Sequence, residues 1–209
     1  MFTSRTFLGI ALSFVCLIFS QSVFAKDSLS LPYLIQNWPQ PLNNQPFNET
    51  RYDTLLGLTS EYKGAFKFNN KSDISIVYTS PIKGSIELRG QSVTVNFPSK
   101  TVSVSLEQVP EVKSFIEPVK ALLSGDVEKL IKENKVMFSS ENVALDKSSQ
   151  VNQSWTLTLS PPGSIVLSAK EVTVKGGELK GKVMISSIKL TFANGDWREF
   201  RLDGVENDR

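Results

Sequence analysis

The chain has 209 residues, with 23 Lys and Arg against 21 Asp and Glu, no histidine and one cysteine. Most hydrolytic triads and catalytic zinc sites use imidazole, so the absence of histidine argues against the commonest enzyme classes. The near-neutral charge without a basic run argues against nucleic-acid binding. At this length we expect one domain with a single hydrophobic core.

The first 25 residues have the order of charge, apolar run and small residues that is typical of a secretory signal peptide. Arg5 precedes an apolar run over residues 7–19, and residues 23–25, Val-Phe-Ala, form the cleavage site. The run has about 13 residues, fewer than the roughly 20 that a membrane-spanning helix needs. Cys16 lies inside the run and would be removed with it. We therefore predict a soluble, thiol-free periplasmic protein that begins at Lys26.

Residues 26–46 contain four prolines, which prevent a helix of any length. The apolar residues of this segment can still supply one short turn docked on the domain, which we expect to cover residues 47–209. These apolar residues are Leu31, Tyr33, Leu34, Ile35 and Trp38.

From residue 63 onward, apolar and polar residues alternate with period two, which predicts short strands with one apolar face. Turn residues such as Asn69-Asn70, Gly90 and Pro98-Ser99 separate the strands and indicate an antiparallel meander. The expected strands cover residues 66–68, 74–78, 86–88, 93–97 and 102–106.

The apolar spacing changes to three and four residues at Pro110, which predicts that a helix begins there. A continuous helix through Pro118 would lose on the order of 3 kcal/mol, so residues 110–133 should form short, kinked pieces, with a second helix over about 126–133. Strands then return, to a total of about ten in one curved antiparallel sheet. They are expected over residues 135–138, 142–145, 155–159, 165–167, 172–174, 182–188, 188–192 and 197–202.

Two further patterns have a structural interpretation. Gly176-Gly177 with Gly181 has the wrong spacing for a phosphate-binding loop and predicts a hairpin turn instead. The acidic residues near the C-terminus alternate with Trp and Arg, which is more typical of a solvated strand edge than of a catalytic carboxylate pair. They are Asp196, Glu199, Asp203 and Glu206.

Several short motifs occur in a characteristic order: Phe47-Asn48-Glu49-Thr50-Arg51, then Gly-Ala-Phe-Lys-Phe at 64–68, a helical insert near 110–134 and a closing Gly-Asp-Trp-Arg at 195–198. In this order they resemble the LolA-like outer-membrane lipoprotein carrier proteins, and most closely a divergent branch with a Phe-x-Glu-x-Arg opening. The resemblance covers about residues 45–205. It implies an unclosed β-barrel whose helices form a lid over an apolar cavity. It also implies acylated lipoprotein or lipid cargo, received from an inner-membrane exporter and carried toward an outer-membrane acceptor.

The residues themselves lead to a similar architecture, because a sheet of ten strands curls and an amphipathic helix across its concave side encloses space. Two functions stay open: a carrier of acyl chains, and a non-catalytic interaction module of a periplasmic envelope or polysaccharide assembly system. A carboxylate-based enzyme is the third possibility. We expect no catalytic residue, no metal and no cofactor, and we expect a monomer.

The apolar side of the alternating strands supplies the expected cavity wall, and the apolar stripe of the helical insert supplies the expected lid. The wall residues are Phe66, Phe68, Ile74, Ile76, Ile86, Leu88, Val93, Val95, Trp155 and Leu157. The lid residues are Val112, Phe115, Ile116, Val119 and Leu122.

Overall fold

The computed structural model describes residues 29–39, 44–68, 73–142, 153–160 and 169–203. The predicted signal peptide over residues 1–25, the expected strand over residues 165–167, positions 143–145 of the expected strand over 142–145, and Glu206 lie outside these ranges. Within them, no helix is both long enough and apolar enough to cross a membrane.

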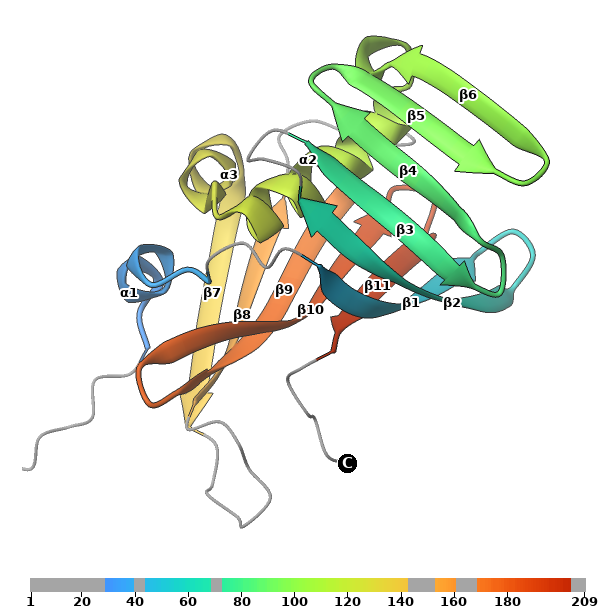
Figure 1. Cartoon of the computed structure of the whole chain (residues 1–209). Helices are drawn as coiled ribbons and strands as arrows, with labels where there is room; N and C mark the ends of the chain where they lie inside the picture. Colours follow the sequence, from blue (N-terminus) through green and yellow to red (C-terminus); the bar gives the residue numbers. More distant parts are fainter. Residues whose placement is uncertain (1–28, 40–43, 69–72, 143–152, 161–168, 204–209) are drawn as a thin grey trace, which may run out of the picture.

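Eleven antiparallel strands form a single sheet in the order β6-β5-β4-β3-β2-β1-β11-β10-β9-β8-β7 (Figure 1). The edge strands β6 and β7 do not pair with each other in the described part of the chain, so the sheet stays open. This confirms the predicted fold class, a curved antiparallel sheet that does not close. The strands are β1 Gln45–Asp53, β2 Leu58–Phe68, β3 Ile74–Ser80, β4 Gly84–Arg89, β5 Ser92–Phe97, β6 Lys100–Ser105, β7 Lys135–Asn142, β8 Gln153–Ser160, β9 Ala169–Leu179, β10 Lys182–Phe192 and β11 Trp197–Leu202.

The helical insert joins the two edges of the sheet. After β6 the chain forms a 3-10 turn, η1 (Leu106–Gln108), then α2 (Pro110–Ser124) and α3 (Val127–Glu133), and continues into β7. Figure 1 shows α2 crossing the concave side of the sheet between the green strands and the orange strands. Because the insert begins at one edge and ends at the other, the helix is held across the concave face at both ends.

The short helix α1 (Leu31–Gln36) confirms the docked turn expected in the proline-rich segment. Ser30 caps its N-terminus and a proline occupies the first turn, where the missing N–H is tolerated. The segment is fixed to β7 and β8 by two hydrogen bonds at Leu29: its amide donates to Gln153 Oε1 at 3.2 Å, and its carbonyl accepts from Ser140 Oγ at 2.9 Å.

Three details of the predicted strands are wrong. Residues 135–142 form one strand, β7, without a break after 138, and residues 182–192 form one strand, β10, in which a register shift near Ile185 replaces the expected boundary. Gly176 and Gly177 lie inside β9, and the hairpin turn that follows is formed by Lys180 and Gly181, with φ angles of 52° and 81°. Two consecutive residues with positive φ are typical of the tight turns that connect twisted strands.

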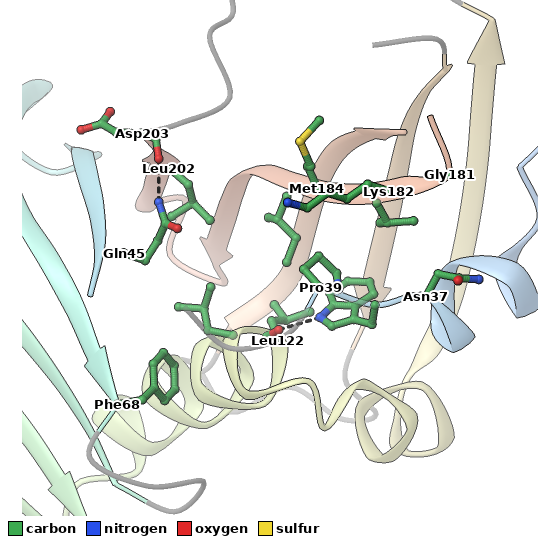
Figure 2. Close-up of a pocket in the computed structure, with 14 residues that line it drawn as sticks. Asn37, Pro39, Gln45, Phe68, Leu122, Gly181, Lys182, Met184, Leu202 and Asp203 are labelled. Atoms are coloured by element: carbon green, nitrogen blue, oxygen red, sulfur yellow. Dashed lines mark hydrogen bonds between the residues drawn. The ribbon is translucent and has the colours of Figure 1, made fainter. Parts of the chain in front are cut away.

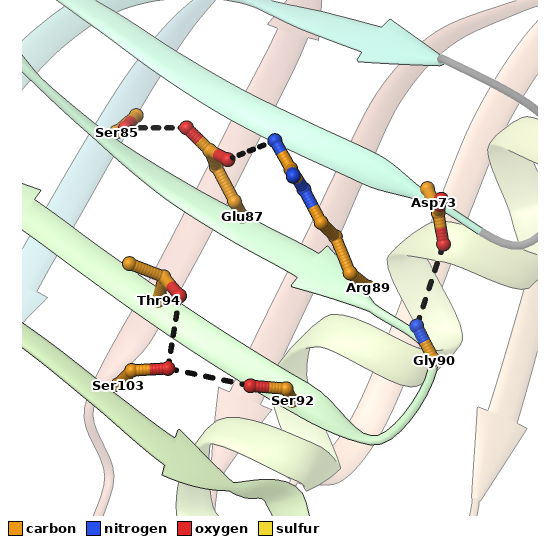
Figure 3. A network of polar contacts seen from close by, with 8 residues as sticks. All are labelled: Asp73, Ser85, Glu87, Arg89, Gly90, Ser92, Thr94 and Ser103. Carbon is orange, nitrogen blue, oxygen red and sulfur yellow. Dashed lines mark hydrogen bonds and ion pairs between the residues drawn. The ribbon is translucent and has the colours of Figure 1, made fainter.

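The two faces of the sheet differ in chemistry because side chains alternate along every strand. The inward residues of β3, β8 and β9 are buried and belong to one continuous hydrophobic core. The outward face of β4 to β6 is polar: Figure 3 shows Glu87 paired with Arg89 at 3.0 Å, and Ser103 bonded to Ser92 and Thr94. A polar outer face leaves the concave face as the side that must be covered.

The helix α2 runs through Pro118 without interruption, so the prediction that this proline breaks the helix is wrong. Pro118 removes one backbone hydrogen bond, but the neighbouring Ile116, Val119 and Leu122 are completely buried. Their burial offsets the lost bond, because a fully buried aliphatic side chain contributes about 1.5–3 kcal/mol. The helix ends at Gly125, whose φ of 83° is the left-handed conformation of a C-terminal cap. The second predicted helix is confirmed as α3.

Two glycines of the concave face lie directly beneath aromatic rings. A Cβ at Gly176 would meet the backbone oxygen of Met184 and the indole of Trp155, and a Cβ at Gly64 would meet the backbone of Val77 and the ring of Phe47. Neither glycine needs an unusual backbone conformation, so close approach explains both residues. Each aromatic ring fills the space that the missing side chain leaves on the neighbouring strand.

We expect Gly176→Ala to lower the free energy of unfolding by about 1–3 kcal/mol, because the added methyl group must displace both a backbone oxygen and the Trp155 ring. Urea denaturation followed by tryptophan fluorescence measures this loss. Lys175→Ala on the same strand is the control, since Lys175 is exposed and its loss should change stability by less than about 0.5 kcal/mol. Equal stability of the two variants would show that the close approach carries no strain.

Candidate functional site

An apolar cavity of about 510 Å³ lies where the C-terminal end of α2 meets the sheet (Figure 2). Its wall combines residues that are far apart in the sequence: Trp38 and Pro39 after α1, Phe68 at the end of β2, Leu122 and Leu123 on α2, the β9–β10 hairpin, and Leu202 on β11. This cavity, which we call the lid cavity, therefore lies between the predicted lid and the predicted wall.

A hydrogen bond joins the N-terminal segment to the lid at the margin of the lid cavity. The indole Nε1 of Trp38 donates to the backbone oxygen of Leu122 at 2.7 Å (Figure 2). Trp38 also contacts Trp155, with ring centroids 5.7 Å apart. Trp38 thus lies between the last turn of α2 and the floor of the sheet.

One polar atom beneath this contact is unsatisfied. Among the described residues, no hydrogen-bond acceptor pairs with Trp155 Nε1, although Trp155 is only 2 % exposed. A buried N–H without a partner is uncommon and is often found where a ligand or water completes the site. The rim of the lid cavity is also polar: Gln45 Nε2 donates to the backbone oxygen of Asp203 at 2.8 Å, and Lys182 lies at the hairpin.

The predicted wall residues share one face of the sheet but not one cavity. Phe68 lines the lid cavity, and Ile86 and Val95 line a second cavity. The other predicted wall residues are packed into the core: Phe66, Ile74, Ile76, Leu88, Val93, Trp155 and Leu157.

Of the predicted lid residues, Leu122 lines the lid cavity, and Ile116 and Val119 are buried in the core. Val112 and Phe115 belong to α2, but their side chains lie outside the described part of the structure. Sequence reasoning did not assign Trp38 or the β9–β10 hairpin to the site. The sequence could have indicated Trp38, because a large aromatic residue in a proline-rich segment needs an apolar surface on which to pack.

The second cavity, also about 510 Å³, lies at the opposite ends of the same strands. It is lined by the end of β1, the start of β2, inward residues of β4 and β5, and the β10–β11 turn. A layer of aromatic rings separates it from the lid cavity: Phe47 contacts Phe66 at 4.6 Å, Phe200 at 5.2 Å and Tyr78 at 5.8 Å between centroids. We call it the arginine cavity because Arg51 and Arg198 line it.

A buried ion pair lies beside the aromatic layer. Arg51 Nε and one terminal nitrogen each donate to the Glu49 carboxylate at 2.8 Å, and the same terminal nitrogen donates to Tyr78 Oη at 2.9 Å. The Glu49 side chain is 0 % exposed and that of Arg51 is 26 % exposed. The Arg51 guanidinium also lies 4.0 Å from the centroid of the Tyr62 ring.

The pKa values follow from these contacts. Burial opposes the charge of Arg51, but the hydrogen bond from Arg51 to Glu49 and the charges around it outweigh burial, so the pKa of Arg51 is raised. Burial, followed by the negative charge of Glu49, raises the pKa of Tyr78, which therefore stays a neutral phenol. Burial, followed by the positive charge of Arg51, lowers the pKa of Arg198.

The described residues contain no group of three or more His, Cys, Asp or Glu placed to hold a metal ion. The polar groups that line or border the two cavities include guanidinium, ammonium, indole, phenol and amide donors. They also include the carboxylates of Glu49, Asp53, Asp196 and Asp203. Such a set can bind and orient a ligand through hydrogen bonds and apolar contact.

No protein-family model matches the sequence, and no curated protein matches it. Similar solved structures include a LolA superfamily protein from Nitrosomonas europaea, with 12% identity and a TM-score of 0.39 over 83% of this chain and 89% of that chain. The lipoprotein LppX from Mycobacterium tuberculosis has 11% identity and a TM-score of 0.37, over 86% of this chain and 100% of that chain. A chain of the MucA/MucB complex from Pseudomonas aeruginosa has 10% identity and a TM-score of 0.38, over 82% of this chain and 53% of that chain. The LolA superfamily, which the sequence motifs resemble, is thus among the similar structures. All three TM-scores are below 0.5, so these similarities carry no argument about the fold. The fold of this chain is described from its own strand order.

We expect Arg51→Met to lower the free energy of unfolding by about 3 kcal/mol, because it leaves the buried Glu49 carboxylate without its bidentate partner. The value lies at the low end for such a change because Arg198 supplies a second positive charge nearby. The double variant Glu49→Gln with Arg51→Met should lose less, since no unpaired carboxylate remains. Chemical denaturation measures both.

Arg201→Met is the matched control, because Arg201 pairs with Glu199 on the surface and its side chain is 55 % exposed. An exposed pair of this kind contributes at most about 1 kcal/mol. Similar losses for Arg51→Met and Arg201→Met would contradict the assignment of Glu49 and Arg51 as a buried, structural ion pair.

Proposed function

We propose that the protein is an extracytoplasmic carrier that binds the acyl chains of a lipoprotein or another lipid between α2 and the concave face of the sheet. The observation that carries this proposal is the lid cavity, an apolar space of about 510 Å³ enclosed by a helix on one side and the sheet on the other. The core side chains of α2 and the sheet provide further apolar surface when the helix moves away.

Acyl chains suit such a site energetically. Each methylene group that moves from water into an apolar environment contributes about 0.8 kcal/mol, so one ten-carbon chain supplies several kcal/mol without any directional contact. Lid and cargo compete for the same wall, because Leu122 both packs on the core and lines the cavity. Cargo therefore opens the lid only as far as it binds the open form better than the closed form.

Trp38 and Trp155 give the site a polar component. Moving Trp38 away from Leu122 breaks their hydrogen bond and uncovers the indole of Trp155, whose N–H has no partner among the described residues. An ester or amide carbonyl at the head of an acyl chain would accept a hydrogen bond from this N–H. The polar rim formed by Gln45 and Lys182 suits the hydrophilic part of such a molecule.

In this proposal the protein acts without catalysis, as a monomer in the periplasm. It takes cargo from an inner-membrane exporter and delivers it to an outer-membrane acceptor. A predicted signal peptide and an apolar cavity support this role.

We expect Phe68→Asn to weaken the binding of decanol, a neutral single-chain probe, about tenfold or more, because Phe68 is half-buried and lines the lid cavity. Titration calorimetry measures the affinity, and thermal unfolding measures stability. Phe97→Asn is the matched control, since Phe97 is also half-buried on the concave face but lines the arginine cavity.

Protein recovered from the periplasm should also release a lipid or lipopeptide into organic solvent, identified by mass spectrometry. If the folded wild-type protein binds no decanol and releases no lipid, the carrier proposal is wrong and a module for protein partners becomes the better explanation. If Phe68→Asn and Phe97→Asn weaken decanol binding equally, the lid cavity is not the acyl site.

A further inference from the structure

The turn between β1 and β2 presents three leucines to solvent. Leu55 is 93 % exposed, Leu56 is 64 % exposed and Leu58 is 59 % exposed. Figure 1 shows this turn at the end of the sheet that lies away from α1. Single exposed apolar residues are ordinary on a protein surface, but three within one turn form a patch, which indicates a binding surface. We call Leu55, Leu56 and Leu58 the leucine tip.

Hydrogen bonds hold this turn in one conformation. The amide of Thr54 donates to Asp196 Oδ1 at 2.8 Å, and the amide of Leu56 donates to Asp53 Oδ1 at 2.8 Å. Thr54 also packs on the β10–β11 turn, where a Cβ at Gly195 would lie 3.0 Å from Thr54 Oγ1. These contacts keep the leucines away from the sheet. They also give two backbone N–H groups of the turn a partner, which lowers the cost of moving the turn into an apolar environment.

An aromatic pair lies behind the leucine tip on the outer face of the sheet. Tyr52 of β1 and Trp197 of β11 are register partners, with ring centroids 5.9 Å apart and planes inclined by 20°. Tyr52 is three residues from Leu55, a distance of at most about 11 Å along the chain. Lys189 of β10 lies farther from the leucine tip and places its Nζ 4.5 Å from the centroid of the Trp197 ring.

The order of these groups matches the layers of a membrane interface. At the surface of a bilayer, leucine side chains favour the hydrocarbon, Trp and Tyr are enriched at the level of the headgroups, and the long side chain of Lys reaches back to the polar layer. The leucine tip, the aromatic pair and Lys189 follow this sequence from the turn into the sheet. A pocket on another protein could receive the leucines but would not require an aromatic pair and a cation behind them.

The charges beside the leucine tip indicate the kind of lipid. The arginine cavity, which Leu58 also lines, carries two carboxylates, Asp53 and Asp196, and two guanidinium groups, Arg51 and Arg198. These charges balance, so they provide no attraction toward an anionic surface. Contact through the leucine tip would therefore depend on apolar burial and suits lipids without net charge.

From this arrangement we propose that the leucine tip inserts into the surface of a lipid bilayer, with Tyr52 and Trp197 at the level of the headgroups. Three leucine side chains carry nearly as many apolar carbons as one myristoyl chain, which binds bilayers with a constant of about 10⁴ M⁻¹. The contact is therefore weak and reversible. It goes beyond the carrier role and does not depend on it, since the leucine tip shares no residue with the lid cavity.

The first test measures cosedimentation of protein recovered from the periplasm with phosphatidylcholine vesicles. Leu55→Ser combined with Leu56→Ser should weaken binding about tenfold or more, because two of the three inserting side chains lose their apolar groups. Met137→Ser is the matched control, since Met137 is also exposed but lies on the edge strand β7. It should change binding by less than about twofold. Thermal unfolding and decanol binding should be unchanged in both variants.

A second measurement uses the wild-type protein, so it does not depend on the folding of a variant. The chain contains three tryptophans, of which Trp38 and Trp155 are buried and Trp197 is half-buried. Vesicles with a nitroxide label near the headgroup should quench the tryptophan fluorescence more than vesicles with the label at the chain end, because Trp197 would lie in the headgroup layer. Trp197→Phe should remove this quenching.

Wild-type protein that does not bind the vesicles would overturn the proposal and would favour an apolar pocket on a protein partner for the leucine tip. Binding that persists unchanged in the folded double serine variant would overturn it as well. Replacing about a fifth of the lipid by anionic phosphatidylglycerol should change binding by less than about threefold, and a much larger increase would show that charge drives the contact. These outcomes leave the carrier role intact, because that role is tested by decanol and Phe68→Asn.

Discussion

The packing of α2 on the concave face of the sheet is the interaction on which the other features depend. An open sheet of eleven strands has one apolar face, and the helix joins its two edges across that face. The inward residues Ile116, Val119 and Leu122 are completely buried there, and without them the concave face would expose a large apolar surface. The same packing creates the lid cavity, because α2 ends at Gly125 before it covers the β9–β10 hairpin. A ligand that displaces the last turn of α2 would replace the apolar contact that this turn makes with the sheet. The concave face would therefore stay covered.

The aromatic layer divides the concave face into two chemically different sites. Phe47, Phe66 and Phe200 contact one another across three adjacent strands, and Gly64 has no Cβ that would collide with the Phe47 ring. On one side the wall is mostly apolar and is covered by a helix. On the other side the Phe-x-Glu-x-Arg segment of β1 places a buried ion pair next to a second arginine. Strand alternation explains how this one short motif supplies both the aromatic layer and the buried ion pair, because Phe47, Glu49 and Arg51 all point inward.

Much of this fold could be predicted from the sequence, because period-two alternation identified most strands and the change of spacing at Pro110 identified the helical insert. Pro118 misled the prediction, since its local penalty was known but the burial of Ile116 and Val119 that offsets it was not. The site was harder to predict. Alternation shows that Leu88 and Phe68 face inward, but whether an inward side chain meets another side chain or an empty space depends on the position of α2, which local sequence does not specify. The pairing of Arg51 with Arg198 depends on a register between residues that are distant in sequence.

Hydrogen exchange of the α2 backbone amides tests the central claim most directly. A synthetic lipopeptide with three acyl chains offers more apolar surface than the lid cavity can hold, so its binding should displace the helix. The amides around Val119 and Leu122 should then exchange faster in the complex than in the free protein, while those of β8 and β9 stay protected. Tight binding of the lipopeptide with unchanged or slower exchange in α2 would show that the helix is a fixed part of the core and not a lid.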